Sequence, residues 1–471
     1  DTLRVGKPIK NLTTRLKSIT FLDDKAAKFL WECNAPLLIY TAEMIPEIAD
    51  SIVEIDNTMK WGFTRDIGIF DSWDAIGVEK SVNKMKEENR KVPSWVEEML
   101  ASGRESFYEI KDGEMTYWCP LQKKALVHEP SKKSLNLNLY KNPKNTLKRD
   151  WSASIHDIGD GVLNVEFHSI FVPAFNPIDR SMNEIVKHAL DMLETGKYKG
   201  LVIGHQGKNW SAGANVNDFK MAIDSGNLQV MDAGVKAMQD VTQRIRHSKY
   251  PVITCPFNFA LGGGFEFYAC SSHTVASGEL YAGLVEAMQG LIPGAGGHLR
   301  VLLNLLENND AKNVNMNIGR QALGLINPMT VSRSATDALK KGWLRKSDTI
   351  AMNSQHLLAL GKSKVLELSD GGYQPPKYRD DLTLPGMTLR TMASVGAKAM
   401  KAQGKISDHD GLVASKTAYV LSGGKKGGLM SKVDEQHVLD IERECFMSLA
   451  GEPKTQDRIA HFLKTGKPLR N

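Results

Sequence analysis

Several signals that often classify a protein are missing from this sequence. Its five cysteines are scattered through 471 residues without a CxxC pair, which argues against a disulfide framework and a thiolate metal site and indicates a reducing compartment. No run of about 18 uncharged apolar residues occurs, so no membrane span is expected. HExxH, P-loop and GxSxG motifs are also absent, so the active sites that they mark are not indicated.

The charge balance is only mildly basic. Lys and Arg number 60 against 54 Asp and Glu, which gives a net charge of +6. This excess is too small and too evenly spread to indicate a nucleic-acid partner, but it suits an anionic small ligand. Hydrophobic residues make up 42% of the chain and charged residues 24%, as in globular proteins. The length predicts roughly two to four domains.

The pattern of apolar residues changes along the chain. Up to about residue 118 the spacing is helical, although Pro36 is expected to interrupt any helix there. Residues 119–150 are rich in Lys, Asn and Pro and predict a linker. From residue 151 to about 300, strands alternate with amphipathic helices, which predicts an α/β core with a parallel sheet. Helices follow to the C-terminus.

Within the predicted core, individual elements can be assigned. Gly159-Asp160-Gly161 predicts a hairpin between two strands. Buried strands are expected at 201–203 and 251–255, and helices at 178–195 and 228–248.

Small residues follow both buried strands. Residues 209–215 read NWSAGAN and residues 260–266 read ALGGGFE. A loop without large side chains lets a ligand approach the backbone N–H groups, and two such loops on neighbouring strands can direct two donors at one oxygen. This is the construction of an oxyanion hole. Tight packing of helix on strand would equally explain the glycines at 262–264, and no GxGxxG dinucleotide motif is present.

Two glutamates lie among apolar residues in the same region. Glu266 stands between Phe265 and Phe267, and Glu286 stands in the segment AGLVEAM. Such surroundings can raise the pKa of a carboxyl group and suit acid–base chemistry. Either residue alone could instead be an exposed helix residue, and only their combination with the two loops favours a catalytic site.

These motifs together resemble the crotonase (enoyl-CoA hydratase) family, over roughly residues 151–300. The resemblance rests on NWSAGAN, on LGGGFE, on the interval from Glu266 to Glu286 and on IPGAGG at 292–297. It implies that the N–H groups of Ala214 and Gly263 hold a thioester carbonyl, while Glu266 activates water and Glu286 protonates the α-carbon. It also implies that the Gly294 N–H positions the water and that Ala212 contacts coenzyme A. The sequence departs from the family pattern at Asn215 and His298.

The N-terminal region is similar to a second family. Segments within residues 48–77, including WGF at 61–63 and FDSWDAIG at 70–77, resemble the C-terminal helical domain of 3-hydroxyacyl-CoA dehydrogenases. The chain therefore resembles the later part of a fused dehydrogenase–hydratase of fatty-acid β-oxidation. We expect it to continue upstream of Asp1, with NAD bound only by a domain that these residues lack. Hydration itself is expected to need no cofactor, since coenzyme A is part of the substrate, and no metal.

The resulting expectation is a multidomain α/β protein with enoyl-CoA hydratase activity. It converts trans-2-enoyl-CoA to (S)-3-hydroxyacyl-CoA; an enoyl-CoA isomerase and a non-catalytic acyl-CoA-binding module are the alternatives. We expect a cytoplasmic protein with an acyl-CoA substrate, no nucleic-acid partner, no membrane span and a possible homo-oligomeric state. The expected parts are a linker or lead-in helix at 1–30, an all-helical domain like the C-terminal domain of the dehydrogenases at 31–118, a linker at 119–150, a crotonase core at 151–300 and a helical region at 301–471.

Overall fold

The computed structural model describes residues 1–9, 11–63, 65–128, 131 and 133–471. The chain forms two compact units, Asp1–Ser131 and Lys132–Asn471. Each unit has a buried apolar core of its own. The division falls inside the segment 119–150 that the sequence predicts as a linker, of which residues 129, 130 and 132 lie outside the described residues.

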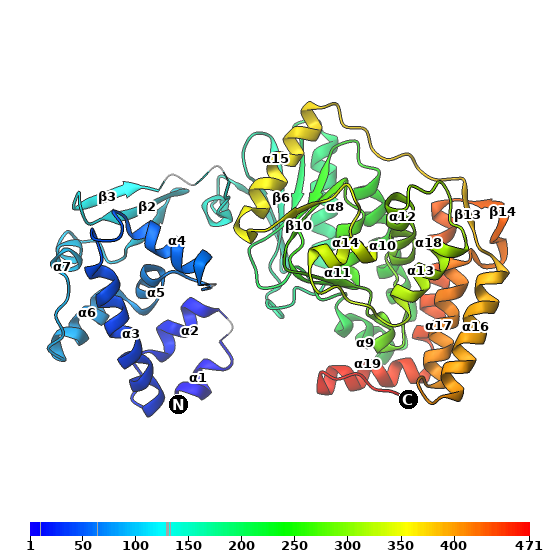
Figure 1. Ribbon diagram of the computed structural model, residues 1–471, viewed down its shortest axis with the longest axis horizontal. Coiled ribbons are helices and arrows are strands. Elements are labelled where there is room, and N and C mark those ends of the chain that lie inside the picture. The colour runs from blue at the N-terminus through cyan, green and yellow to red at the C-terminus, as the bar shows by residue number, and fades with distance from the viewer. Residues whose placement is uncertain (10, 64, 129–130, 132) are drawn as a thin grey trace. The chain divides into compact units, whose positions relative to one another are not determined.

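The first unit is mainly helical, as its apolar spacing predicts (Figure 1). Its core gathers aromatic and aliphatic side chains such as Trp31, Phe70, Trp73 and Phe107. The helices of this unit are α1 (Thr2–Gly6), α2 (Leu12–Ile19), α3 (Lys25–Glu43), α4 (Ile52–Gly62), α5 (Ile69–Ile76), α6 (Val78–Glu87) and α7 (Ser94–Ala101).

Helix α3 continues through Pro36, so the expectation that this proline interrupts the helix is wrong. Pro36 is exposed, and the buried face of α3 carries Trp31, Ala35, Leu38 and Ala42 on both sides of it. Proline removes one backbone hydrogen bond. On the exposed side water can satisfy the freed carbonyl, while packing of the buried face holds the helix on both sides of the proline.

Within the residues that the structure describes, the first unit ends in a three-stranded antiparallel sheet that the sequence pattern did not predict. It consists of β1 (Tyr108–Lys111), β2 (Glu114–Cys119) and β3 (Lys124–Val127). Asp112 and Gly113 connect β1 to β2, and both have positive φ, 54° and 84°. A type I′ hairpin turn requires this conformation, and Asp-Gly is a typical sequence for it.

The second unit is built around a sheet that, within the described residues, has seven strands in the order β12-β10-β8-β7-β6-β5-β4. Strands β6, β7, β8, β10 and β12 are parallel, and β4, β5 and β6 pair antiparallel. These strands are β4 (Thr146–Arg149), β5 (Ala153–Asp157), β6 (Val162–Phe167), β7 (Gly200–Ile203), β8 (Val252–Thr254), β10 (His273–Ser277) and β12 (Thr349–Ala351).

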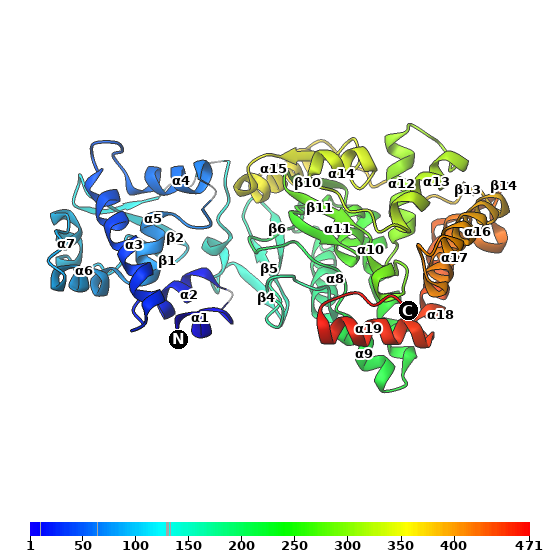
Figure 2. The ribbon, with the colours of Figure 1, turned by 60° about the horizontal axis from the view of Figure 1, so that its bottom comes forward.

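Helices cover both faces of this sheet. Helix α8 (Arg180–Glu194) packs against β5, β6 and β7, and α15 (Leu357–Asp370) packs against β7, β8 and β10. Figure 2 shows the two helices on opposite sides of the strands. Residues of β7 are buried on both faces, which explains why this strand reads as a continuous apolar run. The predicted hairpin, both buried strands and the helix near 178–195 are confirmed.

A second, smaller parallel pair carries the loops of interest. It consists of β9 (Asn258–Leu261) and β11 (Leu280–Gly283), and α11 (Gly263–Ala269) begins directly after β9. The other elements up to this point are η1 (Leu137–Tyr140), α9 (Val216–Asp224) and α10 (Leu228–Arg246).

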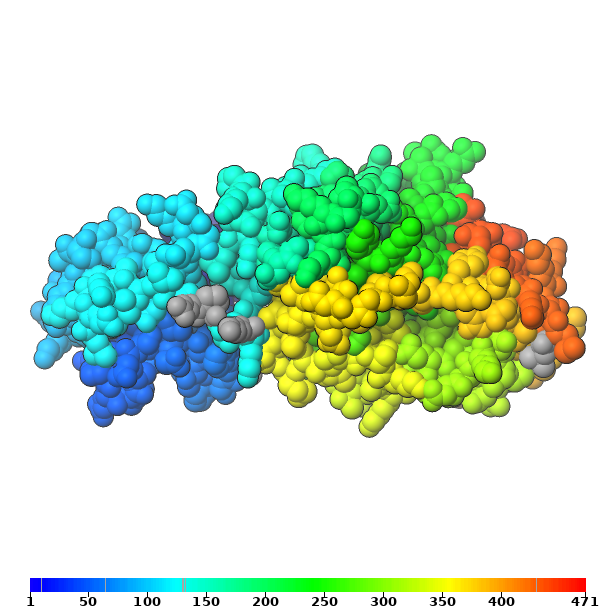
Figure 3. Space-filling model, turned by 90° about the horizontal axis from the view of Figure 1, so that it is seen from above, coloured from blue at the N-terminus to red at the C-terminus, as the bar shows by residue number. Residues whose placement is uncertain are grey.

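The C-terminal part of the unit is helical, as expected, and shares the core of the sheet. Buried residues from α18, such as Val438 and Phe446, belong to the same cluster as the strands. Helix α19 lies along α9 (Figure 2). The chain between α15 and β13 runs over the surface (Figure 3). The remaining elements are η2 (Glu286–Gln289), α12 (Gly297–Asn308), α13 (Met316–Ile326), α14 (Ala335–Lys341), η3 (Ser354–His356), β13 (Leu382–Leu384), α16 (Met387–Ala402), α17 (Asp408–Leu421), η4 (Gly424–Lys426), β14 (Gly428–Val433), α18 (Glu435–Ala450) and α19 (Pro453–Thr465).

The architecture confirms the predicted fold class, an α/β core with helical regions before and after it. The predicted linker is not featureless, because β3, η1 and β4 lie within it. Among the described residues, no helix has both the length and the apolar character that crossing a membrane requires.

Packing of β7 against its neighbours can be tested at Gly200. A β-carbon at this position would lie 2.6 Å from the Pro251 carbonyl oxygen and 2.6 Å from Val365 Cγ1. We expect Gly200→Ala to lower the free energy of unfolding by about 1–3 kcal/mol through overpacking. Gly234→Ala is the matched control, because nothing lies within 4 Å of its β-carbon inside α10. It should raise stability by up to about 1 kcal/mol. Urea unfolding of both variants tests this, and equal effects would contradict it.

Candidate active site

The two small-residue loops meet beside β9. Ser211 N donates to the Phe259 carbonyl at 2.9 Å, and Leu261 N donates to the Ser211 carbonyl at 2.9 Å, so the first loop pairs with β9 through one parallel bridge at Ser211 and Ala260. Gly213 and Gly262 adopt φ of 109° and 52°, which a residue with a β-carbon rarely adopts. The glycines therefore permit a backbone path that brings the two loops into contact.

This contact brings the N–H groups of Ala214 and Gly263 together. A β-carbon on Gly263 would lie 3.4 Å from the Ala214 nitrogen. Within the described parts of the chain, neither N–H donates a hydrogen bond to a protein acceptor. Both residues line one cavity. Two free donors at the edge of a cavity can bind one ligand oxygen, as an oxyanion hole requires.

Glu266 lies on α11, one turn after Gly263, and is buried. Its Oε1 accepts hydrogen bonds from Ala295 N at 2.7 Å and from Gly297 N at 2.8 Å. Burial raises the pKa of Glu266 well above its usual range, and the charges of Glu286 and Glu442 raise it further, while the two N–H donors oppose the shift.

Glu286 begins η2 and faces the same cavity. It is close to the loops, because a β-carbon on Gly262 would meet Glu286 Oε1 at 2.9 Å. Among the described residues, Glu286 Oε2 has no hydrogen-bond partner although it is buried. Burial raises the pKa of Glu286 to about 7, and the charge of Glu442 adds to the shift. Backbone hydrogen bonds from Glu286 and Val285 oppose this rise. Because Oε2 has no hydrogen-bond partner in the described part of the chain and the residue lines the cavity, this oxygen is available to a ligand or to water.

The cavity has a volume of about 380 Å³. Ala212, Ala214, Gly263, Glu266, Glu286 and Gly294, the six residues predicted for the site, all line it. The structure therefore brings these residues together, while their chemical roles stay predictions. Most of the remaining lining is apolar, and an apolar environment disfavours the charged form of the carboxyl groups.

Several residues of the site were missed by reasoning from the sequence. Phe446 on α18 and Phe462 and Leu463 on α19 complete the apolar lining. Glu442, also on α18, lies close enough to influence both catalytic candidates. No local motif marks these residues, because they lie far along the chain from the two loops and only the fold brings them close.

The two departures from the family pattern have structural explanations. Asn215 caps α9, with its side chain accepting a hydrogen bond from Asn217 N at 3.2 Å. His298 is buried at the start of α12, and its Nδ1 lies 2.7 Å from Glu442 Oε2. Among the described residues, no group of His, Cys, Asp and Glu side chains could hold a metal ion.

The sheet and the cavity define a crotonase-type α/β domain. In agreement, residues 157–324 match the family model described as enoyl-CoA hydratase/isomerase. The family name covers more than one reaction, so it does not by itself identify the activity.

Curated relatives extend the similarity over nearly the whole chain. A "Probable 3-hydroxyacyl-CoA dehydrogenase" of Bacillus subtilis is 37% identical over 469 residues, which cover 100% of this chain and 58% of that protein. A "Putative fatty acid oxidation complex trifunctional enzyme" of Rickettsia felis is 25% identical over 459 residues, or 95% of this chain and 55% of the relative. The chain thus spans a little over half the length of these relatives.

Among solved structures, an enoyl-CoA hydratase from Rhodobacter sphaeroides matches with a TM-score of 0.48 and 16% identity, covering 68% of this chain and 92% of that one. An enoyl-CoA hydratase from Bacillus halodurans matches with a TM-score of 0.43 and 14% identity, covering 65% of this chain and 99% of that one.

The raised pKa of Glu286 predicts a pH-dependent contribution to stability. A carboxyl group that holds its proton more tightly when folded stabilises the protein below its unfolded pKa, near 4.5, and this stability is lost as the pH rises through about 7. Glu286→Gln removes the effect. We therefore expect the stability of the variant, relative to wild type, to increase between pH 5 and pH 8 (bracketing these two values). Urea unfolding at both pH values tests this, and a constant difference would contradict it.

Proposed function

We propose that the second unit hydrates trans-2-enoyl-CoA to (S)-3-hydroxyacyl-CoA. The proposal rests on one observation: two carboxyl groups and two free N–H donors line a single apolar cavity. Adding water across a double bond conjugated to a thioester needs a base for the water, an acid for the α-carbon and donors for the carbonyl oxygen.

The N–H groups of Ala214 and Gly263 would bind the thioester oxygen. Attack on the β-carbon moves the electrons of the double bond toward this oxygen and gives an enolate. Donors that already point into the cavity stabilise this developing charge without reorganisation. Because these donors belong to the backbone, the conformation of Gly213 and Gly262 controls their positions.

Glu266 and Glu286 would divide the proton transfers. Charged Glu266 takes a proton from the water while the water oxygen adds to the β-carbon. Glu286 donates a proton to the α-carbon. Both carboxyl groups have raised pKa values, so the pair retains a proton near neutral pH. Hydrogen bonds from the Ala295 and Gly297 N–H groups favour the charged form of Glu266, whereas Glu286 Oε2 has no such partner among the described residues. We assign the proton to Glu286 on this geometry and not on the pKa shifts, which are upward for both groups. The Gly294 N–H would hold the water.

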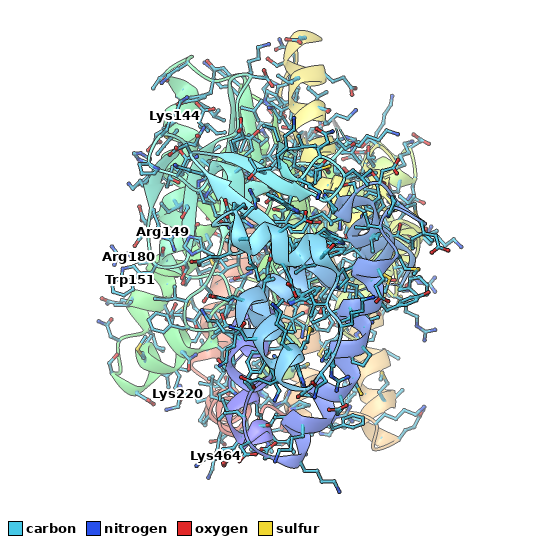
Figure 4. The ribbon with its side chains drawn as sticks, turned by 90° about the vertical axis from the view of Figure 1, so that its left-hand side faces the viewer. Lys144, Arg149, Trp151, Arg180, Lys220 and Lys464 are labelled. Atoms are coloured by element: carbon cyan, nitrogen blue, oxygen red, sulfur yellow. The ribbon has the colours of Figure 1, made fainter. Side chains whose placement is uncertain are left out.

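The surroundings of the cavity suit an acyl-CoA. The apolar lining would accept the acyl chain. Lys220 of α9 directly follows Phe219, and Lys464 of α19 directly follows Leu463; Phe219 and Leu463 line the cavity. Figure 4 shows both lysines on the same side of the molecule as Arg180. Such cations favour the phosphates of coenzyme A. Ala212, in the cavity lining, would contact the adenine part of coenzyme A.

The whole protein is proposed to be a bifunctional 3-hydroxyacyl-CoA dehydrogenase/enoyl-CoA hydratase. The relative that is 37% identical carries the dehydrogenase name, and this chain aligns with 58% of it. The residues of this chain contain no glycine-rich dinucleotide motif that would hold NAD, so no hydride step is assigned to them. A cytoplasmic location and a homo-oligomeric state stay predictions.

Loss of absorbance of crotonyl-CoA at its conjugated band measures the activity. We expect hydration by the wild-type chain, and a decrease in kcat of about 10²–10⁴-fold in both Glu266→Gln and Glu286→Gln. Glu279→Gln is the matched control, because Glu279 is exposed on the turn before β11 and its side chain accepts a hydrogen bond only from Tyr281 among the described residues. It should keep the wild-type rate.

Other products would identify other functions. Conversion of a 3-enoyl-CoA to a 2-enoyl-CoA without hydration would replace the proposal by an isomerase. Tight binding of acyl-CoA without turnover would replace it by a binding module. Near wild-type rates in either glutamine variant would overturn the roles of the two residues.

The pH dependence provides a separate test. Because Glu286 must hold a proton, kcat/KM is expected to fall as the pH rises above about 7, the value to which burial raises its pKa. The residual activity of Glu286→Gln should lack this decline. A wild-type kcat/KM that stays level to about pH 9 would contradict Glu286 as the acid.

A further inference from the structure

The loop that leads into α12 donates its N–H groups alternately in two directions. Ala295 and Gly297 donate to Glu266, while Gly296 N donates to Glu442 Oε1 at 2.6 Å and His298 N donates to Glu442 Oε2 at 2.9 Å. Four successive peptides are thus held between a carboxyl group of the cavity and a carboxyl group of α18.

Glu442 and His298 form a buried, hydrogen-bonded pair of side chains. Both side chains are buried with 0% exposure. The third hydrogen bond to Glu442 comes from His298 Nδ1 at 2.7 Å. His298 Nε2 is buried and has no partner among the described residues. An imidazole with its proton on Nδ1 fits this arrangement, because Nε2 then needs no acceptor.

Helix α10 holds the opposite side of the same loop. Gln239 Nε2 donates to the Gly294 carbonyl at 2.9 Å and to the Leu439 carbonyl of α18 at 3.0 Å. Thr242 Oγ1 donates to the Ala295 carbonyl at 3.0 Å. The loop is therefore fixed from α10, α11 and α18, and its donors cannot turn toward Glu266 independently of Glu442.

We infer that Glu442 and His298 are positioning residues for hydration: by binding the Gly296 and His298 peptides they orient the Ala295 and Gly297 N–H groups onto Glu266 and place the Gly294 N–H at the cavity. This inference rests on the proposed function. Glu442 does not line the cavity, so it acts through the loop and through its charge and not by contact with substrate.

The charge of Glu442 has a second consequence. It raises the pKa of Glu266 and of Glu286, and it does so across the same loop. Helices α10, α12, α17 and α19 also pack against α18. Arg300 of α12 bonds Gln243 on α10. Asp232 of α10 forms an ion pair with Arg443 of α18, and Lys416 of α17 bonds Ser448 of α18. These charged groups therefore bond residues of α18 other than Glu442. Titratable groups that interact with Glu442 include His298, Glu266, Glu286 and Cys445.

Two substitutions of Glu442 separate position from charge. Glu442→Gln removes the charge and replaces one acceptor by a donor that faces N–H groups. We expect kcat to fall by up to about 10²-fold with little change in KM. The pH at which kcat/KM declines on the alkaline side should move to lower pH, because the pKa of Glu286 falls without the Glu442 charge. Glu442→Asp keeps the charge but shortens the side chain, so it should lower kcat without moving the pH profile.

A matched control lies on the same helix. Glu435 is also a buried glutamate of α18 and also pairs with a histidine, His247, at 3.2 Å. It does not line the cavity and does not contact the loop. Glu435→Gln should lower stability but leave kcat and the pH profile unchanged. If it changes both as Glu442→Gln does, the effect is general destabilisation and the inference is overturned.

His298 provides milder variants in case the Glu442 variants do not fold. Asparagine can place an N–H donor close to the position of Nδ1, whereas alanine cannot. We expect His298→Ala to lower kcat and His298→Asn to restore most of it. Wild-type kcat in His298→Ala, or wild-type kcat and pH profile in Glu442→Gln, would overturn the inference.

A failure of the proposed function can be distinguished from a failure of the inference about Glu442. Carbon-13 NMR of labelled glutamate side chains measures the titration of Glu266 and Glu286 without any substrate. If the wild type hydrates no enoyl-CoA but Glu442→Gln lowers these pKa values and Glu435→Gln does not, the function is wrong while the coupling of Glu442 to the pair stands. Unchanged titration in Glu442→Gln would refute the coupling itself.

Discussion

A buried carboxyl group is unfavourable unless backbone or side-chain donors satisfy it, and in the second unit two such groups meet at one loop. Glu266 and Glu442 take all four N–H groups of residues 295–298. Residues 295 and 296 precede α12, and Gly297 and His298 begin it; the apolar residues of α12 belong to the main core. The geometry of the candidate site therefore depends on the packing of the whole unit and not on the two loops alone.

The same constraint explains why the helices after residue 300 matter to the site. Helix α18 supplies Glu442 and Phe446, and α19 supplies Phe462. Without them the loop would lose half of its acceptors and the cavity would be open on one side. A crotonase core that ended near residue 300 would contain both catalytic candidates but neither their support nor a closed apolar lining.

Local patterns predicted what is determined locally. The apolar runs at 201–203 and 251–255 form buried strands, and the small residues of both loops allow the close approach that the cavity needs. The resemblance to crotonases then predicted six residues that the structure places in one cavity. The prediction that Pro36 interrupts a helix was wrong, because an exposed proline can be tolerated when the opposite face of the helix is buried. The Asp112-Gly113 turn was passed over although its sequence is typical of a hairpin.

Glu442 could not be predicted, because nothing near it in the sequence indicates that it reaches a loop 144 residues away. His298 departs from the family pattern and contacts Glu442, but only the fold identifies this contact.

The central claim is that one cavity holds a thioester oxygen on two backbone amides between a pair of carboxyl groups. A crystal structure of the protein with a non-hydratable acyl-CoA analogue tests it most directly. The account predicts the thioester oxygen about 2.7–3.1 Å from both Ala214 N and Gly263 N, with the α- and β-carbons between Glu266 and Glu286. A thioester bound elsewhere, or a carbonyl directed away from the two amides, would contradict it.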